Sequence, residues 1–300
     1  MKIFLKFSGL IIFLLLTALG CTDKDSESFE SKLPERSLTE DFKKYWFIGE
    51  AEITSYKLEQ SRYGENREGT AVLIFVTEDF LPKDQVKAYK STNNSIPILK
   101  LNATKNFLTG IYPYSIMQST FYPLEGNSHA IKVAASIQEW CGQVYVQLNN
   151  RENFEIVSHS YFDGEADQEL ALFKTNLENE VWTQLRIDPD LLPTGEIEMV
   201  PSMEYLKLSH QEIKSYAAMA EFYQDQEYSV YKVSYPDLKR ELKIYYNNFA
   251  PYTIEKWTEQ IEANGVLQTS TATKLETLKI DYWNKNSNKD LPLRDQLKLN

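Results

Sequence analysis

The stretch that decides the fold runs from residue 131 to residue 148 and reads IKVAASIQEWCGQVYVQL. Apolar residues occupy every second position in its first half, and the pattern resumes after a short interruption. These positions are Ile131, Val133, Ala135 and Ile137, followed by Val144, Val146 and Leu148. A half-buried β-strand requires this period of two, because successive side chains point to opposite faces. We therefore predict two neighbouring strands that pair as an antiparallel hairpin.

Similar patterns lie on both sides of this stretch. Upstream, residues 46–63 and 69–77 form one predicted pair, and residues 96–107 and 112–122 form the next. Downstream, strands are predicted at residues 154–161, 195–200, 203–208, 228–235, 241–246 and 275–282. Successive hairpins without βαβ units indicate antiparallel sheet, and the edges of so large a sheet need curling or closure. We predict a mainly β fold: a large curved antiparallel sheet, an open barrel or a β-sandwich.

One or two helices are expected beside the sheet. Residues 167–185 carry a partial stripe of apolar residues at the 3.6-residue spacing of an amphipathic helix. The stripe consists of Leu170, Leu172, Leu177, Val181 and Leu185. Residues 253–261 fit a shorter second helix, although a strand suits them nearly as well.

The first twenty residues have the three parts of an export signal. Lys2 and Lys6 supply positive charge, residues 10–16 are a dense apolar run, and small residues lead to Cys21. This order resembles a bacterial lipobox, although Ala18 stands where leucine is usual. We therefore predict a lipoprotein signal peptide at residues 1–20 and lipidation of Cys21. A plain secretory signal and a retained anchor are the alternatives, but the apolar run is short beside the roughly 20 residues of a membrane span.

Residues 21–37 are expected to form a flexible acidic tether, since residues 23–28 read DKDSES and offer little apolar area for folding. The same acidic residues also fit a signal for export to the cell surface. Residues 38–300 then form a β-rich domain, or two packed subdomains, long enough for a substantial core. With Cys21 acylated, Cys141 has no disulfide partner, and we expect it to be a buried structural thiol.

The composition is acidic. Asp and Glu number 43 against 32 Lys and Arg, which gives a formal charge of −11. Removal of residues 1–20 takes away two lysines and brings this charge from −11 to −13. An acidic chain lacks the basic surface that nucleic-acid binding needs, and it has no broad attraction to anionic lipid head groups. We therefore expect no nucleic-acid partner, and contact with the membrane through the N-terminal lipid.

Familiar catalytic signatures are absent from the sequence, including Gly-x-Ser-x-Gly, the phosphate-binding Gly-x-x-x-x-Gly-Lys-[Ser/Thr] loop and His-Glu-x-x-His. There is no Cys-x-x-Cys pair for zinc, and we expect no metal and no cofactor. His129, Glu155 and His159 are the candidates for an acid–base site, although their spacing matches no stringent motif. Ordinary polar positions on strands explain them more simply.

Aromatic residues are frequent, with 19 Tyr, 15 Phe and 5 Trp. Tyr112, Tyr114 and Tyr122 fall on one predicted hairpin, and Trp140 follows between the next two strands. Amphipathic rings stack on sugars or line a lipophilic groove, so these four residues are the candidate ligand contacts. Packing across neighbouring strands is the alternative role for such residues.

Several further stretches occur together in this chain. They include residues 67–78 (REGTAVLIFVTE), 109–115 (TGIYPYS), 138–142 (QEWCG), 148–151 (LNNR) and 158–161 (SHSY). On these stretches the mature chain resembles, over nearly all its length, a family of uncharacterised outer-membrane lipoproteins from Gram-negative bacteria. Members sometimes carry the name "septum formation inhibitor Maf". The Ser-x-Ser-Pro-Arg-Arg stretch of true Maf-type nucleotide pyrophosphatases is absent from this chain, and their α/β fold conflicts with its strand pattern, so the resemblance implies no catalytic residues.

Together these features predict a non-enzymatic cell-envelope lipoprotein, anchored to the outer membrane on its periplasmic or cell-surface face. Its sheet is expected to bind a partner protein, a glycan or a lipophilic ligand. One alternative is an envelope hydrolase that uses His159 with nearby carboxylates. Another is a lipid or lipoprotein chaperone, which requires an apolar cavity of several hundred cubic ångströms rather than a filled interior.

Overall fold

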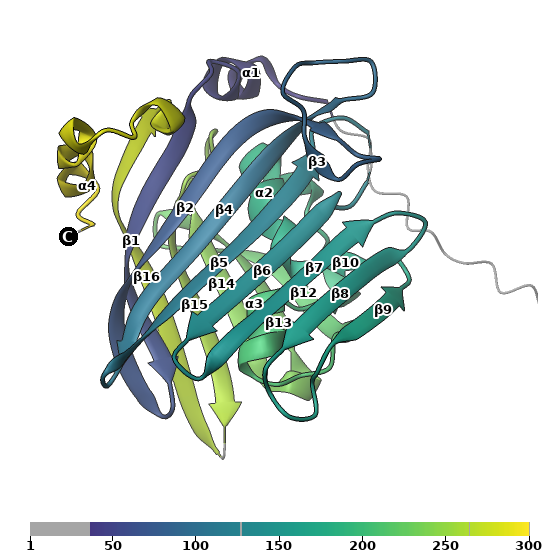
Figure 1. Ribbon diagram of the computed structural model, residues 1–300, viewed down its shortest axis with the longest axis vertical. Helices are drawn as coiled ribbons and strands as arrows, with labels where there is room; N and C mark the ends of the chain where they lie inside the picture. Colours follow the sequence, from purple (N-terminus) through teal and green to yellow (C-terminus); the bar gives the residue numbers. More distant parts are fainter. Residues whose placement is uncertain (1–36, 127, 264, 300) are drawn as a thin grey trace, which may run out of the picture. The chain divides into compact units, whose positions relative to one another are not determined.

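The predicted hairpins join into one continuous sheet in the computed structural model (Figure 1). The structure describes residues 37–126, 128–263 and 265–299, within the second of two units into which the chain divides, residues 33–300. The predicted signal peptide, the lipidation of Cys21 and nearly all of the tether lie outside the described residues. Among the described residues the sheet has 16 strands and is accompanied by four α-helices. The mainly β fold predicted from the sequence is confirmed.

The elements follow one another in the chain with short connections. The strands are β1 (Ala51–Arg62), β2 (Glu65–Leu81), β3 (Val86–Lys87), β4 (Ile96–Thr109), β5 (Tyr112–Pro123), β6 (Lys132–Glu139), β7 (Gly142–Asn150), β8 (Phe154–Ser160), β9 (Gln168–Leu172), β10 (Asn176–Leu177), β11 (Gly195–Val200), β12 (Tyr216–Asp225), β13 (Tyr228–Tyr235), β14 (Arg240–Tyr246), β15 (Ile254–Ala263) and β16 (Val266–Ile280). The α-helices are α1 (Glu40–Trp46), α2 (Glu178–Ile187), α3 (Met203–Leu208) and α4 (Pro292–Gln296). Short 3-10 helices are η1 (Pro189–Leu191), η2 (Pro236–Leu238), η3 (Tyr282–Asn284) and η4 (Asn288–Asp290).

The strand order shows how the chain returns on itself. It runs β10-β11-β12-β13-β14-β15-β16-β1-β2-β4-β5-β6-β7-β8-β9, with β3 beside β2. In the described part of the chain, neighbouring strands pair antiparallel except β10 and β11, which are parallel. The edges β9 and β10 are joined by residues 173–175, so the sheet must curl until its edges lie within roughly 14 Å. It does not close into a barrel.

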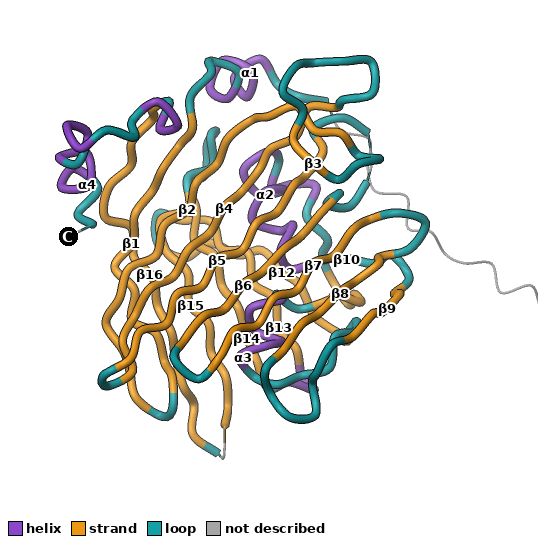
Figure 2. Tube along the Cα trace, in the orientation of Figure 1, coloured by secondary structure: helices purple, strands orange, loops and turns teal. Residues whose placement is uncertain are grey.

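Helices α2 and α3 fill the inside of the curled sheet (Figure 2). Helix α2 packs on β4 and β5, and α3 packs on β5 and β6, while β12–β15 lie on the other side of the helices. All residues of α2 are buried except Trp182, which is partly buried. The Glu180 carboxylate accepts hydrogen bonds from the backbone N–H groups of Leu177 and Ala130. It thereby satisfies a donor at the start of the helix and ties α2 to the loop before β6.

A buried ion pair ties α2 to the first strand. The Arg186 guanidinium donates two hydrogen bonds to the Glu52 carboxylate, at 2.6 and 2.7 Å, and both side chains are 1% exposed. Burial by itself raises the pKa of Glu52, but the adjacent guanidinium outweighs it and holds the pKa below its ordinary value. Arg186 also lies over the rings of Trp46 and Phe75. These contacts hold α1, β1, β2 and α2 together at one end of the sheet.

The helices differ from the sequence prediction in number and position. Four are present among the described residues rather than one or two, and the helix predicted at residues 167–185 begins only at Glu178. Leu170 and Leu172 belong instead to β9, where they alternate with exposed residues and pair with β8. Pairing with a neighbouring strand therefore outweighs the helical spacing of these leucines.

Two other segments also adopt a different structure from the one favoured in the sequence. Residues 253–261, proposed as a second helix with strand as the alternative, fall largely in strand β15, and residues 203–208 form α3 instead of a strand. The hydroxyl of Ser202 accepts a hydrogen bond from the Tyr205 backbone N–H at 3.2 Å, a typical start signal for a helix. Cys141, expected to be buried, is exposed because it lies in the turn between β6 and β7.

Candidate functional site

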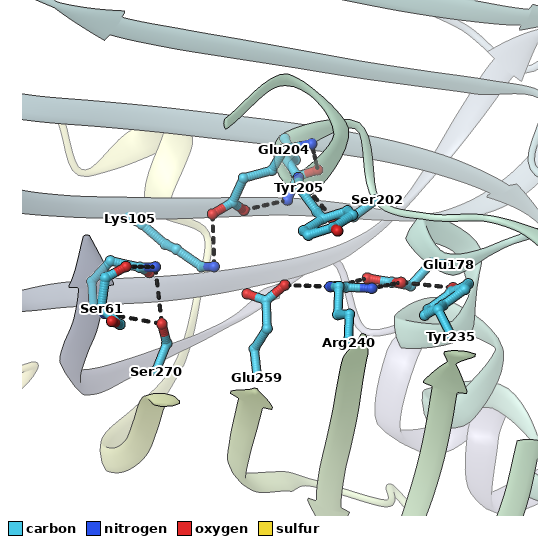
Figure 3. A network of polar contacts seen from close by, with 12 residues as sticks. Ser61, Lys105, Glu178, Ser202, Glu204, Tyr205, Tyr235, Arg240, Glu259 and Ser270 are labelled. Atoms are coloured by element: carbon cyan, nitrogen blue, oxygen red, sulfur yellow. Dashed lines mark hydrogen bonds and ion pairs between the residues drawn. The ribbon is translucent and has the colours of Figure 1, made fainter. Parts of the chain in front are cut away.

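A charged network crosses the interior between the helices and the sheet (Figure 3). At its centre, Arg240 of β14 donates hydrogen bonds to both carboxylate oxygens of Glu178 on α2 and to Glu259 of β15. Nη2 lies 2.7 Å from Glu178 Oε1, and Nε lies 2.6 Å from Glu259 Oε1. The guanidinium carbon is 4.3 Å from the ring centroid of Tyr205 and 5.3 Å from that of Tyr235. A planar cation with these partners is held in one orientation.

Lys105 and Glu204 continue the network on its other side. Lys105 Nζ of β4 lies 2.8 Å from Glu204 Oε1 on α3. Gln118 Nε2 of β5 donates to Glu204 Oε2 at 2.8 Å, and Gln118 Oε1 accepts from Asn179 Nδ2 at 2.9 Å. Asn179 follows Glu178 in α2, so polar contacts link both helices to strands on either side of them.

The network favours the charged forms of Lys105 and Glu259. Burial lowers the pKa of Lys105, but the carboxylates of Glu204 and Glu259 outweigh burial and raise it above its ordinary value. Burial raises the pKa of Glu259, but Arg240 and Lys105 outweigh burial and hold it below its ordinary value. An acid–base catalyst needs a pKa close to the working pH, so Lys105 and Glu259 are suited to positioning rather than to proton transfer.

A small cavity of about 50 Å³ lies within the network. Its walls include Trp182 and Trp257 as well as the charged side chains of Lys105, Glu204 and Glu259. One water needs roughly 10–15 Å³, so the cavity has room for only a few water molecules. It is far smaller than the several hundred cubic ångströms that the lipid-chaperone alternative requires.

A larger cleft of about 400 Å³ opens at the end of the sheet where β1 turns into β2. Its walls come from the ends of β1, β15 and β16 and from α3 with the loop that follows it. Glu204 and Glu259 line both the cleft and the small cavity, so the charged network forms the floor of the cleft. The volume lies within the range of small-molecule sites.

Two polar atoms in the cleft wall are buried without a hydrogen-bond partner among the described residues: Gln60 Oε1 and Arg62 Nε. Gln60 Nε2 donates to the Ser61 carbonyl at 3.2 Å and to Ser270 Oγ at 3.0 Å. Because a carbonyl only accepts, this contact fixes which atom of the Gln60 amide is the oxygen. Gln60 is 5% exposed, and a buried polar atom without a partner is costly. The unpartnered acceptor of Gln60 and the unpartnered donor of Arg62 therefore indicate a site for a polar ligand or for water.

An aromatic strip, defined as Tyr63, Tyr114, Tyr112 and Trp140, leads from the cleft to the turn between β6 and β7. The hydroxyls of Tyr63 and Tyr114 are hydrogen-bonded at 2.7 Å, and the Arg62 guanidinium lies 4.6 Å from the Tyr63 ring centroid. The ring centroid of Tyr112 lies 6.1 Å from that of Tyr114 and 6.4 Å from that of Trp140. Tyr63 is 61% exposed and Trp140 is 69% exposed. Tyr114 between them is only 3% exposed, so the strip offers ring surface mainly at its two ends, on Tyr63 beside the cleft and on Trp140.

Three of the four predicted ligand contacts, Tyr112, Tyr114 and Trp140, come together in this strip, and of these Tyr114 is buried in the hydrophobic core. Tyr122 does not, because it is fully buried at the other end of β5, where its hydroxyl accepts a hydrogen bond from Gln184 Nε2 at 3.0 Å. Tyr112 and Tyr122 point to the same face of β5, but they are ten positions apart, which spans about 33 Å. Sequence periodicity predicts on which face of the sheet a side chain lies. It does not predict which end of the strand lies near the cleft.

The predicted acid–base residues do not converge. His129 Nδ1 lies 2.8 Å from a Glu180 oxygen on α2, whereas His159 Nδ1 lies 3.0 Å from Asp167 at the surface. Glu155 and His159 are exposed on β8, on the face opposite to its buried residues. Across the described ranges, no group of three or more His, Cys, Asp or Glu side chains could hold a metal ion.

The charged network could not be recognised from the sequence, because its members lie far apart in the chain. One signal was present: Lys105 and Arg240 occupy inward-facing positions of strands whose other inward-facing residues are mostly apolar. Lys105 continues the series Leu101 and Ala103, and Arg240 precedes Leu242 in the same phase. A lone charge at such a position must find a buried partner, which marks it as a residue to examine.

No protein-family model, no curated protein and no solved structure matches the chain. Membership of the lipoprotein family that the sequence resembles therefore stays a prediction. Considering residues 37–126, 128–263 and 265–299, no helix is long and apolar enough to cross a membrane.

The charged network makes stability depend on pH through Glu259. Its lowered pKa contributes stability that is present above the ordinary value of 4.5 and is lost as the pH falls through the folded-state pKa. We expect Glu259→Gln to lower the free energy of unfolding by about 1–3 kcal/mol at neutral pH. The difference from wild type should shrink below about pH 4.5, as urea unfolding at a series of pH values will measure.

Glu262→Gln is the control for this experiment, because Glu262 is an exposed carboxylate that pairs with Lys239 at the surface. Its unfolding free energy should stay close to that of wild type at every pH. A loss for Glu259→Gln that remains constant from neutral to acid pH would contradict the assignment.

Proposed function

We propose that this protein is a non-enzymatic outer-membrane lipoprotein that binds a small polar ligand in the cleft at the β1–β2 turn. The observation that carries the proposal is the pair of unpartnered atoms, Gln60 Oε1 and Arg62 Nε, buried among the described residues in the wall of a cleft of about 400 Å³. Small-molecule sites typically combine a concave surface with a few converging polar groups.

The residues of the cleft support binding better than catalysis. Glu259 on the floor is ionised and engaged by Arg240, so it is a poor proton acceptor at neutral pH. His210 lines the cleft, and its Nδ1 is hydrogen-bonded to Glu165. In the described part of the chain, no serine or cysteine side chain is hydrogen-bonded to His210 to serve as a nucleophile. His159, on which the hydrolase alternative depends, pairs with Asp167 at the surface and does not line the cleft, so that alternative has less support than binding.

The proposed anchor is the acylated Cys21, which holds the protein at the periplasmic or cell-surface face of the outer membrane. The chain enters the described fold at α1, and β1 runs from there to the cleft over 12 residues, about 40 Å. Helix α1 and the β1–β2 turn lie at opposite ends of β1 (Figure 1), and the cleft is at the turn.

Removal of the acylated thiol should release the protein from the membrane. Acyl chains contribute about 0.8 kcal/mol per buried CH₂ group, and Cys21→Ala removes the point of attachment. We expect cell fractionation to find wild type in the outer-membrane pellet and Cys21→Ala in the soluble fraction. Retention of a signal-cleaved Cys21→Ala protein in the pellet would refute the lipid anchor.

A bulky side chain in the cleft should abolish ligand binding without unfolding the protein. Ala263, partly buried at the end of β15, lines the cleft, and Ala263→Trp adds an indole there without removing a polar side chain. The small polar molecules of a Gram-negative envelope extract should raise the unfolding temperature of wild type and leave Ala263→Trp unchanged, because a ligand that binds only the folded state stabilises it. Thermal unfolding with and without the extract measures this.

Ala217→Trp is the matched control, since Ala217 is exposed on β12. It should respond to the extract as wild type does. An equal response of Ala263→Trp, or no response of wild type, would count against the cleft as the binding site.

A further inference from the structure

The polar groups of the cleft suit a ligand that both donates and accepts hydrogen bonds. Within the described residues, Gln60 Oε1 lacks a donor and Arg62 Nε lacks an acceptor, and a hydroxyl group can satisfy either of them. Gln211 and Gln268 add neutral amide groups to the same walls. A ligand with several neighbouring hydroxyl groups matches this set of partners.

The charges of the cleft disfavour an anionic ligand. Glu204, Glu259 and Glu262 line it, against the single guanidinium of Arg62 among the described lining residues. Each of these three carboxylates already has a cationic partner within the protein, so none of them requires a positive charge from the ligand. An uncharged ligand therefore fits the cleft best.

Tyr63 is a fixed flat surface at the rim of the cleft. It has a φ of +56° and is followed by Gly64 at +77°, both in the left-handed region, in a two-residue turn closed by Arg62 and Glu65. Such a turn favours asparagine or glycine at its first position, and a bulky residue there is strained. The hydroxyl of Tyr114 and the guanidinium of Arg62 hold the Tyr63 ring in place. Strain maintained by neighbouring contacts is typical of functional sites.

We infer that the ligand is a carbohydrate, an inference that rests on the proposed function of the cleft. The apolar face of one sugar ring packs on Tyr63, while its hydroxyl groups bond to Gln60 and Arg62. Further sugars of the same chain pass over the buried Tyr114 and the half-buried Tyr112 to Trp140, which is 69% exposed at the far end. The cleft and the strip together form an elongated site for an oligosaccharide.

Isothermal titration calorimetry with the full-length protein tests this inference. The carbohydrate probes are maltotriose, cellotriose, chitotriose and mannotriose, each beside its monosaccharide. Trialanine and AMP are the probes for a peptide and for an anionic nucleotide. We expect at least one trisaccharide to bind and both of these other probes to give no binding heat.

Tyr63→Asn separates a binding role from a structural one. It should weaken trisaccharide binding by about tenfold or more, as expected for loss of a central aromatic contact. The thermal unfolding temperature should not fall, because asparagine suits the left-handed turn better than tyrosine does. Tyr89→Asn, at a fully exposed tyrosine away from the cleft, is the matched control and should bind as wild type does.

Trp140→Ala tests the extension along the aromatic strip. It should weaken trisaccharide binding more than monosaccharide binding, because only the longer ligand reaches that end of the strip. Trp283→Ala, at a tryptophan that is 44% exposed in η3, is the control and should leave both affinities unchanged.

The outcomes separate this inference from the proposed function. Absence of binding by every saccharide, or saccharide binding that Tyr63→Asn leaves intact, overturns the carbohydrate assignment. Binding of trialanine or AMP that Ala263→Trp abolishes also overturns it, yet leaves the cleft as a ligand site. If the envelope extract also fails to stabilise wild type, the proposed function fails as well.

Discussion

The interior of this protein depends on the neutralisation of one buried cation, Arg240. Its hydrogen bonds to Glu178 and Glu259 join α2 to the adjacent strands β14 and β15. A buried charge that loses its partner destabilises a protein by several kcal/mol, so these residues must be in place together. Glu259 also lines the cleft, and the contacts that complete the interior therefore fix the floor of the proposed binding site.

The curl of the sheet explains why a filled interior and an open cleft coexist. Residues 173–175 join the two edge strands, so the sheet must wrap around whatever lies between its halves. Helices α2 and α3 occupy that space, and a small cavity of about 50 Å³ lies between them and the strands. Beyond the charged network, the ends of β1, β15 and β16 leave the larger cleft. Ligand binding is thereby confined to one end of the fold.

Structural features that depend on neighbouring residues were predictable from the sequence, whereas features that depend on contacts between distant residues were not. Strands such as residues 131–148 were identified because their alternation is local and continuous. Leu170 and Leu172 were assigned to a helix because their pairing with β8 depends on the fold. The partners of Lys105 and Arg240 come from separate elements, and the unusual turn conformation of Tyr63 is a property of the backbone. Periodicity contains none of this information, although a lone inward-facing charge signals that a partner exists.

A double-mutant cycle between Arg240 and Glu178 tests most directly whether their contact organises the interior. Urea unfolding of Arg240→Met, Glu178→Gln and the double variant gives the three free energies that the cycle needs. We predict that the double variant is far less destabilised than the sum of the single variants, with a coupling energy of about 2 kcal/mol or more. Losses that simply add, with a coupling energy near zero, would contradict the central role of this contact.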